Sequence, residues 1–207
     1  MNDFITTLER GDLFEILCHE AAACRVCPRL ADHTAVMGRC NGTLIPKVLF
    51  VGEAPGRLGA DRTRRPFTGD QSGARFDELL ASIDLSRDEA FITNAVLCCP
   101  ADDAHNFTPA ISEVRNCGRF LRRTLDLLAP PVVATLGAVA LRAVGRLIDR
   151  PLVLADTAGT IIECDEFLLV PLYHPSPRVL RTVRSFEQQK ADFAAVREAI
   201  AFTTVAV

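Results

Sequence analysis

The feature that most restricts the fold of this chain is the alternation of short apolar segments with helical ones. The apolar segments have the length of buried strands and lie at 46–51, 90–97, 131–136, 160–164 and 167–172. Helical spacing of apolar residues appears between them, as at Phe76, Leu79 and Leu80. Strands that alternate with helices predict a parallel sheet covered on both faces. We therefore expect an α/β fold with three layers, α/β/α, around a central, mainly parallel sheet of about four strands.

The other predicted helices follow from capping signals and periodicity. Thr108 and Pro109 are typical of a helix N-cap and first turn. The helix after them would bury one face, with Cys117 on the inward side and the apolar residues Ile111, Val114, Leu121, Leu125 and Leu128. Gly137 leads into a helix from 138 to 148, and a last helix is expected at 185–201.

Length and composition favour one domain. The 207 residues are 49% hydrophobic, which is enough for one sizeable core without disulfides. We expect a single domain over 1–207, in which 1–45 is a helical segment that also carries the first cysteine ligands. No apolar run reaches the roughly 18 residues of a membrane span. The N-terminus mixes charged and apolar residues, so we expect a cytoplasmic, monomeric protein without a signal peptide or a membrane partner.

The charge excludes one class of protein. A formal net charge of −3 is not that of a globally basic nucleic-acid binder. A protein that contacts a few phosphates needs only a local basic patch, so the charge leaves DNA binding open.

Eight cysteines are unusual in a cytosolic protein, where structural disulfides are rare. Cys24 and Cys27 form a C-x2-C pair, which Cys117 and either Cys98 or Cys99 would complete. Four thiolates suit either a tetrahedral zinc ion or an iron–sulfur cluster. The long gap after Cys27 argues against a zinc finger. The alternative is that these cysteines are small buried apolar residues.

Polar residues follow several of the predicted strands. The segment GEAPG (52–56) follows the first strand, Asn94 lies in the second, and YHPSP (173–177) follows the last. The carboxyl ends of parallel strands meet at one edge of a sheet, where ligands bind. Taken singly, GEAPG can be a tight turn, Asn94 a strand cap and Phe67 a core residue. His174, displayed in a loop before Pro175, favours a functional role.

In combination these motifs resemble the family-4 and family-5 uracil-DNA glycosylases. The resemblance runs from Cys24 to the last helix through GEAPG, RPFTGD-x-SG (65–73), ITNAVLC (92–98), Cys117 and YHPSP. GEAPG and Asn94 are similar to family 4, whereas the long spacing from Gly56 to Asp70 is similar to family 5. The related uracil-crosslinking proteins have a histidine where this chain has Asn106, so irreversible capture is not expected.

The resemblance implies a role for each matching residue. It implies a structural four-iron four-sulfur cluster on Cys24, Cys27, Cys98 and Cys117, with Cys99 as an alternative ligand. Catalysis would fall to Glu53 and His174, with Asp70 as a second candidate carboxylate and Asp61 behind both. Gly52, Ala54, Phe67 and Asn94 would bind the flipped base. From their position after the His174 loop, Arg178, Arg181 and Arg184 are expected to contact DNA, and Val179 and Leu180 to wedge into the gap left by the flipped base. The alternative is that this segment is the solvated start of a helix.

The chemistry expected is hydrolysis of the N-glycosidic bond of deoxyuridine in DNA. Lys47 and Lys190 are the only lysines and neither falls near the predicted site, so no Schiff-base lyase step is expected. Two other interpretations remain: a non-catalytic DNA-lesion binder or polymerase accessory with the same fold, and a zinc-stabilised flavodoxin-like protein that handles a small nucleotide.

Overall fold

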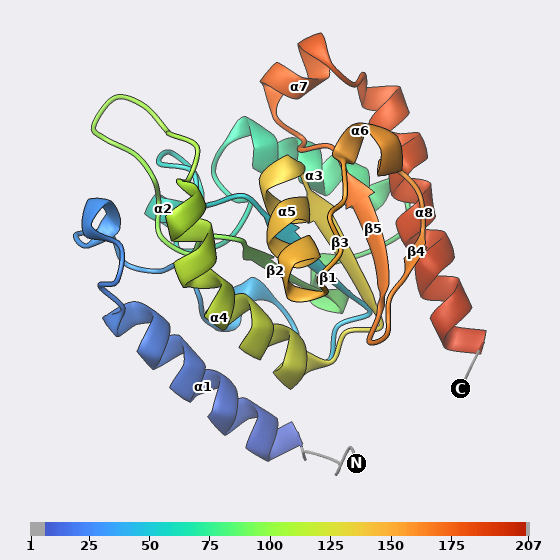
Figure 1. The fold of residues 1–207 in the computed structure, drawn as a ribbon. Helices are drawn as coiled ribbons and strands as arrows, with labels where there is room; N and C mark the ends of the chain where they lie inside the picture. The colour runs from blue at the N-terminus through green and yellow to red at the C-terminus, as the bar shows by residue number, and fades with distance from the viewer. Residues whose placement is uncertain (1–6, 206–207) are drawn as a thin grey trace.

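A five-stranded sheet forms the centre of the protein. The structure is a computed structural model and describes residues 7–205. The strands are β1 (Val48–Gly52), β2 (Ala90–Asn94), β3 (Val132–Leu136), β4 (Ile162–Glu163) and β5 (Leu168–Leu172), in the order β2-β1-β3-β5-β4. All neighbouring pairs are parallel except β4 with β5, which is antiparallel. The expected α/β class is confirmed, and the short β4 makes five strands where about four were expected (Figure 1).

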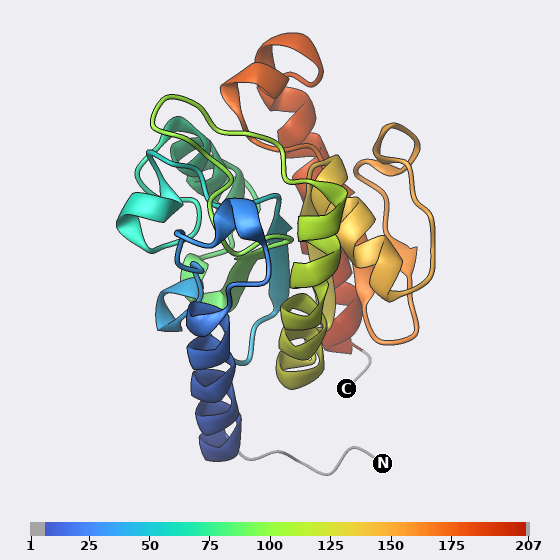
Figure 2. The same ribbon diagram turned by 60° about the vertical axis from the view of Figure 1, so that its left-hand side comes forward.

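Helices cover both faces of the sheet. They are α1 (Thr7–Ala23), α2 (Ala60–Thr63), α3 (Gln71–Ala81), α4 (Ile111–Leu128), α5 (Ala138–Leu147), α6 (Leu154–Thr157), α7 (Pro177–Thr182) and α8 (Phe186–Val205). One-turn 3₁₀ helices are η1 (Pro28–Leu30), η2 (Arg39–Asn41) and η3 (Arg87–Glu89). On one face, α1, α4 and α5 pack on Leu49, Val51 and Val133. On the other face, α3 and α8 pack on Phe50 and Val170, which gives the three layers (Figure 1, Figure 2).

The strand register brings the motif loops to one edge. Gly52 pairs with Asn94 at the carboxyl ends of β1 and β2, and Leu136 pairs with Leu172 at the ends of β3 and β5. The Gly137 amide then donates to the Leu172 carbonyl at 2.8 Å, which closes the turn after β3 against β5. Because these strands are parallel and buried, the loops after them leave the sheet on the same side.

The start of α4 differs from the prediction. The helix begins at Ile111 with Ala110 as N-cap, so Thr108 and Pro109 precede it. Glu113 explains the shift, because its carboxylate accepts from the Ala110 amide at 2.7 Å and is held by Arg29 at 2.6 Å. Ile111 is consequently 69% exposed instead of buried. The rest of the expected face is buried, namely Val114, Leu121, Leu125 and Leu128.

The segment before β1 packs on the same core. Phe14 of α1 is fully buried and meets Phe91 of β2 edge to face, with ring centroids 5.6 Å apart. Arg123 of α4 pairs with Glu20 of α1, which lies beside it (Figure 2). Gly42 bridges to Phe91 and so covers part of the open edge of β2. Across residues 7–205, no helix combines the length and the apolar character needed to cross a membrane.

Candidate active site

The ends of β1 and β2 meet where Gly52 has no side chain. A Cβ at Gly52 would lie 2.5 Å from Oδ1 of Asn94 and 2.9 Å from Cε2 of Phe67. Both distances are shorter than van der Waals contact, so only glycine lets Asn94 and Phe67 approach the strand this closely. Asn94 is 3% exposed, and Phe67 is buried as well. Three of the predicted base-binding residues therefore lie together.

Phe67 also joins this group to His174. The two rings lie with centroids 5.5 Å apart at an angle of 34°. The ring of Phe76 packs against that of Phe67, with the centroids 4.8 Å apart. The His174 loop is fixed from α8, where the buried Gln189 donates to the His174 carbonyl at 3.4 Å. The ring of Phe67 thus lies close both to the end of β2 and to the loop after β5.

Burial keeps the His174 imidazole neutral. It lowers the pKa of His174 to about 4, and the negative charge of Asp70 opposes this effect. An imidazole with this pKa carries no charge at pH 7 and can donate a hydrogen bond through one nitrogen.

Glu53 follows Gly52 directly and has the opposite shift. Burial raises the pKa of the Glu53 carboxyl, and the positive charge of Arg142 in α5 counteracts the rise. The Glu53 carbonyl accepts from the Val96 amide at 3.1 Å, which fixes the start of the loop after β1. Ala54 is half-buried and packs against the core beneath α4 and α5.

The other two candidate carboxylates are engaged by protein groups. Oδ1 of Asp70 caps α3 by accepting from the Gly73 amide at 2.9 Å, and its Oδ2 faces Gly56 and Gly59. Asp70 still acts on His174 through its charge. Asp61 is paired with Arg64 at 3.3 Å. Of the three, Glu53 alone directly adjoins Gly52 in the chain.

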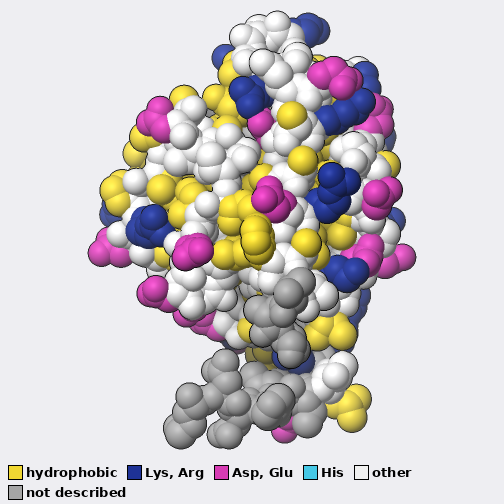
Figure 3. All heavy atoms as spheres, turned by 90° about the vertical axis from the view of Figure 1, so that its right-hand side faces the viewer, with side chains coloured by type: hydrophobic (Ala, Val, Ile, Leu, Met, Phe, Trp, Pro, Cys, Tyr) yellow, Lys and Arg dark blue, Asp and Glu magenta, His cyan; other side chains and the backbone are white. Residues whose placement is uncertain are grey.

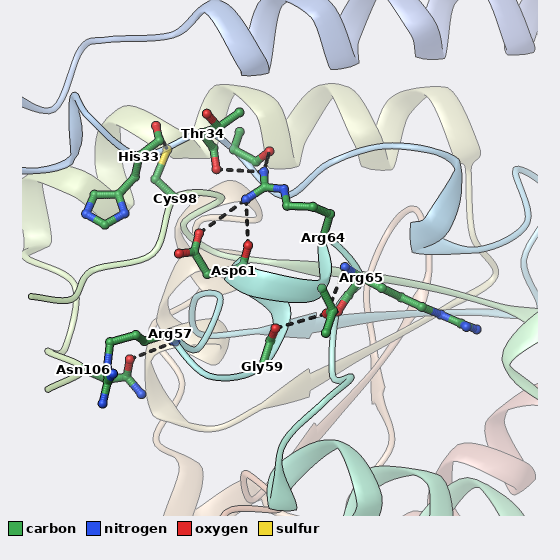
Figure 4. A network of polar contacts seen from close by, with 11 residues as sticks. His33, Thr34, Arg57, Gly59, Asp61, Arg64, Arg65, Cys98 and Asn106 are labelled. Carbon is green, nitrogen blue, oxygen red and sulfur yellow. Dashed lines mark hydrogen bonds and ion pairs between the residues drawn. The ribbon is translucent and has the colours of Figure 1, made fainter. Parts of the chain in front are cut away.

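The loop from 56 to 70, which carries Phe67, is tied to two other segments. The Arg57 amide donates to Oδ1 of Asn106 at 3.0 Å, and its guanidinium donates to the Ala104 carbonyl at 2.8 Å. Arg64 reaches the carbonyls of Thr34 at 2.9 Å and Ala35 at 2.5 Å (Figure 4). Asn106 therefore helps to hold the loop in place.

Four thiols surround a second site. Cys24, Cys27, Cys98 and Cys117 line one pocket between the end of α1, the loop after β2 and α4. The sulfurs accept hydrogen bonds from the Leu97 amide at 3.3 Å (Cys117), Asn116 at 3.6 Å (Cys27) and Arg119 at 3.3 Å (Cys24). Cys99 is fully buried and does not line this pocket.

The thiol pocket is costly for negative charge unless a cation shares it. Burial raises the pKa of Cys98 to about 11 and of Cys117 to about 12, and the neighbouring thiols add to both shifts. Four thiols with N–H donors around them match the donor set of an iron–sulfur cluster. Within 7–205, no three His, Cys, Asp or Glu side chains are close enough to hold a single metal ion.

The predicted DNA-contacting residues form α7, which projects beyond the carboxyl edge of the sheet (Figure 1). Arg178 and Arg181 are exposed, whereas Val179 and Leu180 are partly buried. Arg184 instead forms a two-bond ion pair with Asp192 of α8, at 2.9 and 2.5 Å. Several Lys and Arg side chains gather near the α7 end of the face in Figure 3.

Comparison with known proteins identifies the family. The model of the uracil DNA glycosylase superfamily matches residues 41–200, which include β1 to β5 and all the motif loops. The chain belongs to the uracil DNA glycosylase superfamily.

Three relatives in this superfamily show which branches are similar. The type-4 uracil-DNA glycosylase of Thermotoga maritima is 36% identical over 64% of this chain and 66% of its own length. The type-4 enzyme of Archaeoglobus fulgidus is 31% identical over 88% of this chain and 90% of its own. The type-5 enzyme of Pyrobaculum aerophilum is 30% identical over 78% and 81%. The resemblance to both branches is confirmed.

Sequence reasoning missed several residues of this superfamily member. Asn116 and Arg119 flank Cys117 on α4, and their proximity to the thiols depends on how α4 packs. Gln189 and Arg87 donate hydrogen bonds to backbone carbonyls, and no sequence motif marks contacts of this kind. Of these residues, Asn116 is the one that the sequence could have indicated, because it directly precedes a predicted ligand.

Proposed function

We propose that this protein is a monofunctional uracil-DNA glycosylase, which hydrolyses the N-glycosidic bond of deoxyuridine in DNA and leaves an abasic site. The observation that carries the proposal is the meeting of Gly52, Asn94, Phe67 and His174 at the carboxyl edge of the sheet. Family membership supports the same activity.

Base recognition follows from the chemistry of these side chains. A base must leave the duplex to be excised, and the flipped ring can stack on Phe67. The amide of Asn94 can accept from N3–H of uracil and donate to O4. Cytosine presents the opposite polarity at both atoms and would leave the buried amide unpaired, which supplies the discrimination. Gly52 and Ala54 would form the backbone wall beside the ring.

Bond cleavage leaves negative charge on the base and positive character on the sugar. The neutral imidazole of His174 can donate to uracil O2 as that charge develops. The Glu53 carboxylate can stabilise the sugar and orient the attacking water. Asp70 would act indirectly, because it caps α3 and raises the proton affinity of His174.

The two lysines give no support to a lyase step. Both lysines are paired with carboxylates, Lys47 with Glu89 at 2.5 Å and Lys190 with Glu187 at 3.0 Å. A Schiff base needs a free neutral amine next to the sugar. This supports simple hydrolysis.

The thiol pocket would hold a four-iron four-sulfur cluster on Cys24, Cys27, Cys98 and Cys117. When bound, the cluster would serve as a cross-link between the segment after α1, the loop after β2 and α4. The N–H groups that point at the sulfurs support this assignment. Arg178, Arg181, Val179 and Leu180 of α7 would contact the DNA strand, and the protein would work as a cytoplasmic monomer.

The test is release of uracil from a panel of oligonucleotides that contain uracil, cytosine or thymine opposite guanine. We expect uracil release and an abasic product without strand cleavage. Glu53→Ala with His174→Ala should abolish release, while Glu187→Ala, on the outside of α8, should leave it unchanged. Binding of uracil-containing DNA without release would instead favour the non-catalytic lesion binder.

A further inference from the structure

We infer that Arg87 is a positioning residue that holds Phe67 in place as the stacking surface for the flipped base. The inference rests on the proposed function, because that function gives Phe67 its role. Arg87 lies in η3, at the start of β2, and matches none of the motifs that the sequence shares with the glycosylases.

Phe67 has a backbone conformation that it would not adopt unaided. Its φ is +49°, in the left-handed region that bulky side chains disfavour. The Phe67 carbonyl also lies so close to Gly73 that a Cβ there would overlap it. An arrangement of this kind persists only where neighbouring groups fix it.

Arg87 supplies the fixing contacts. Its Nη1 donates to the Pro66 carbonyl at 3.0 Å and its Nη2 to the Phe67 carbonyl at 2.5 Å. Its Nε donates to Asp77 of α3 at 2.6 Å. The guanidinium also lies 5.5 Å above the ring of Phe76, which in turn supports the ring of Phe67.

This set of contacts separates positioning from catalysis. Each of the three guanidinium nitrogens donates to a protein group, which supports a role for Arg87 in positioning Phe67 and not in contacting the substrate. Its side chain is 17% exposed and lines a cavity of about 340 Å³ on the β2 side of the molecule, together with Arg39, Asn41 and Arg65. Solutes can therefore reach the position of the guanidinium.

The test is a double-mutant cycle on uracil excision. In Arg87→Ala we expect KM to rise about tenfold with kcat nearly unchanged, because stacking acts on the bound base before and during cleavage. Phe67→Ala should show the same pattern. The KM of the double variant should equal that of Phe67→Ala alone, since the contacts of Arg87 have no function without the Phe67 ring. Arg75→Ala is the matched control, because Arg75 pairs with Glu78 within α3 and does not contact the loop.

Two further measurements distinguish loss of the Arg87 contacts from misfolding of the variant. Millimolar guanidinium should restore the KM of Arg87→Ala but not that of Phe67→Ala, and Arg87→Lys should be intermediate. Effects that multiply in the double variant, or an Arg87→Ala enzyme with wild-type KM, would overturn the inference.

A readout without activity keeps the two proposals distinguishable. With fluorinated phenylalanine, the Phe67 resonance can be assigned by its loss in Phe67→Leu. We expect it to shift in Arg87→Ala, as the ring leaves His174, and to stay fixed in Arg75→Ala. If wild-type protein releases no uracil, the proposed function is wrong. If the Phe67 resonance does not shift in Arg87→Ala, Arg87 does not position Phe67.

Discussion

Burial acts in opposite directions on Glu53 and His174, because it always disfavours the charged form. It raises the pKa of the Glu53 carboxyl and lowers that of the His174 imidazole to about 4. As the pH falls, Glu53 therefore gains its proton at a higher pH than an ordinary glutamate does. His174 becomes charged only near pH 4. The acid limit of activity should belong to Glu53.

Removing Arg142 should move that limit. The positive charge of Arg142 lowers the pKa of Glu53, so Arg142→Ala raises it further. Because Glu53 acts as the carboxylate, activity should then be lost at a higher pH than in the wild type. The measurement is kcat/KM against pH. Arg146→Ala, one turn further along α5, is the control. An unchanged acid limb in Arg142→Ala would remove Glu53 from its assigned role.

At the residue scale, part of the site could be predicted from the sequence. Gly52, Asn94 and His174 follow parallel strands or lie at their ends, and such ends meet at one edge of a sheet. The placement of the Phe67 ring beside His174 could not be predicted, because it depends on a left-handed turn held by Arg87 from another part of the chain. Likewise, Asp70 was a candidate carboxylate, and its capping of α3 depends on where that helix begins.

At the scale of elements, the close packing at the end of β1 restricts what can replace Gly52. Gly52→Ala should push Asn94 and Phe67 out of place, since the new Cβ would overlap both. We expect kcat/KM to fall by about two orders of magnitude and stability by about 1–3 kcal/mol. Uracil release and urea unfolding measure the two effects.

Gly118 offers a matched control for this substitution. It lies in α4, and a Cβ there would meet no atom within 4 Å. Gly118→Ala should keep full activity and gain about 0.5–1 kcal/mol of stability from helix propensity. Equal losses in both variants would mean that Gly52 has no special part in the site.

The loop from 56 to 70 depends on Arg64 for its attachment to the segment at 33–35. Arg64→Ala removes the two bonds to the Thr34 and Ala35 carbonyls. We expect faster amide hydrogen exchange in both segments, because each then opens without the other. Arg62→Ala, in the short helix α2 that Arg64 caps, should leave exchange unchanged. Exchange that is equal in wild type and Arg64→Ala would show that the two segments are held by other contacts.

Element boundaries show where sequence patterns stop being informative. The body of α4 was predicted, because its buried face repeats at helical spacing. Its start was wrong, since Glu113 and Arg29 together outweigh the capping signal of Thr108. The sequence also contained no signal for the short helix α6, which is only Leu154–Thr157.

At the scale of the whole molecule, the four thiols connect distant parts of the chain. Cys117→Ala should give protein without the absorbance near 400 nm expected of an iron–sulfur cluster, and it should unfold at a lower temperature. Cys99→Ala is the control, because Cys99 is buried outside the thiol pocket. It should keep the absorbance and lose only the stability of a small cavity. If Cys99→Ala also lost the absorbance, the assignment of Cys98 in place of Cys99 as the third ligand would be contradicted.

The fold as a whole was predictable as a class but not in its strand order. Alternating elements indicated the parallel three-layer sheet. The order β2-β1-β3-β5-β4 depends on which strands pair, and pairing is decided by contacts between segments far apart in sequence.

The strand-end loops that form the site are distributed from Gly52 to Pro175, so the ribosome makes the first of them long before the last. A chain interrupted during synthesis, or trimmed before His174, lacks the last strand-end loop of the site. Copies that stop before this loop should therefore not remove a base, because the site is assembled only once the loop after β5 is present.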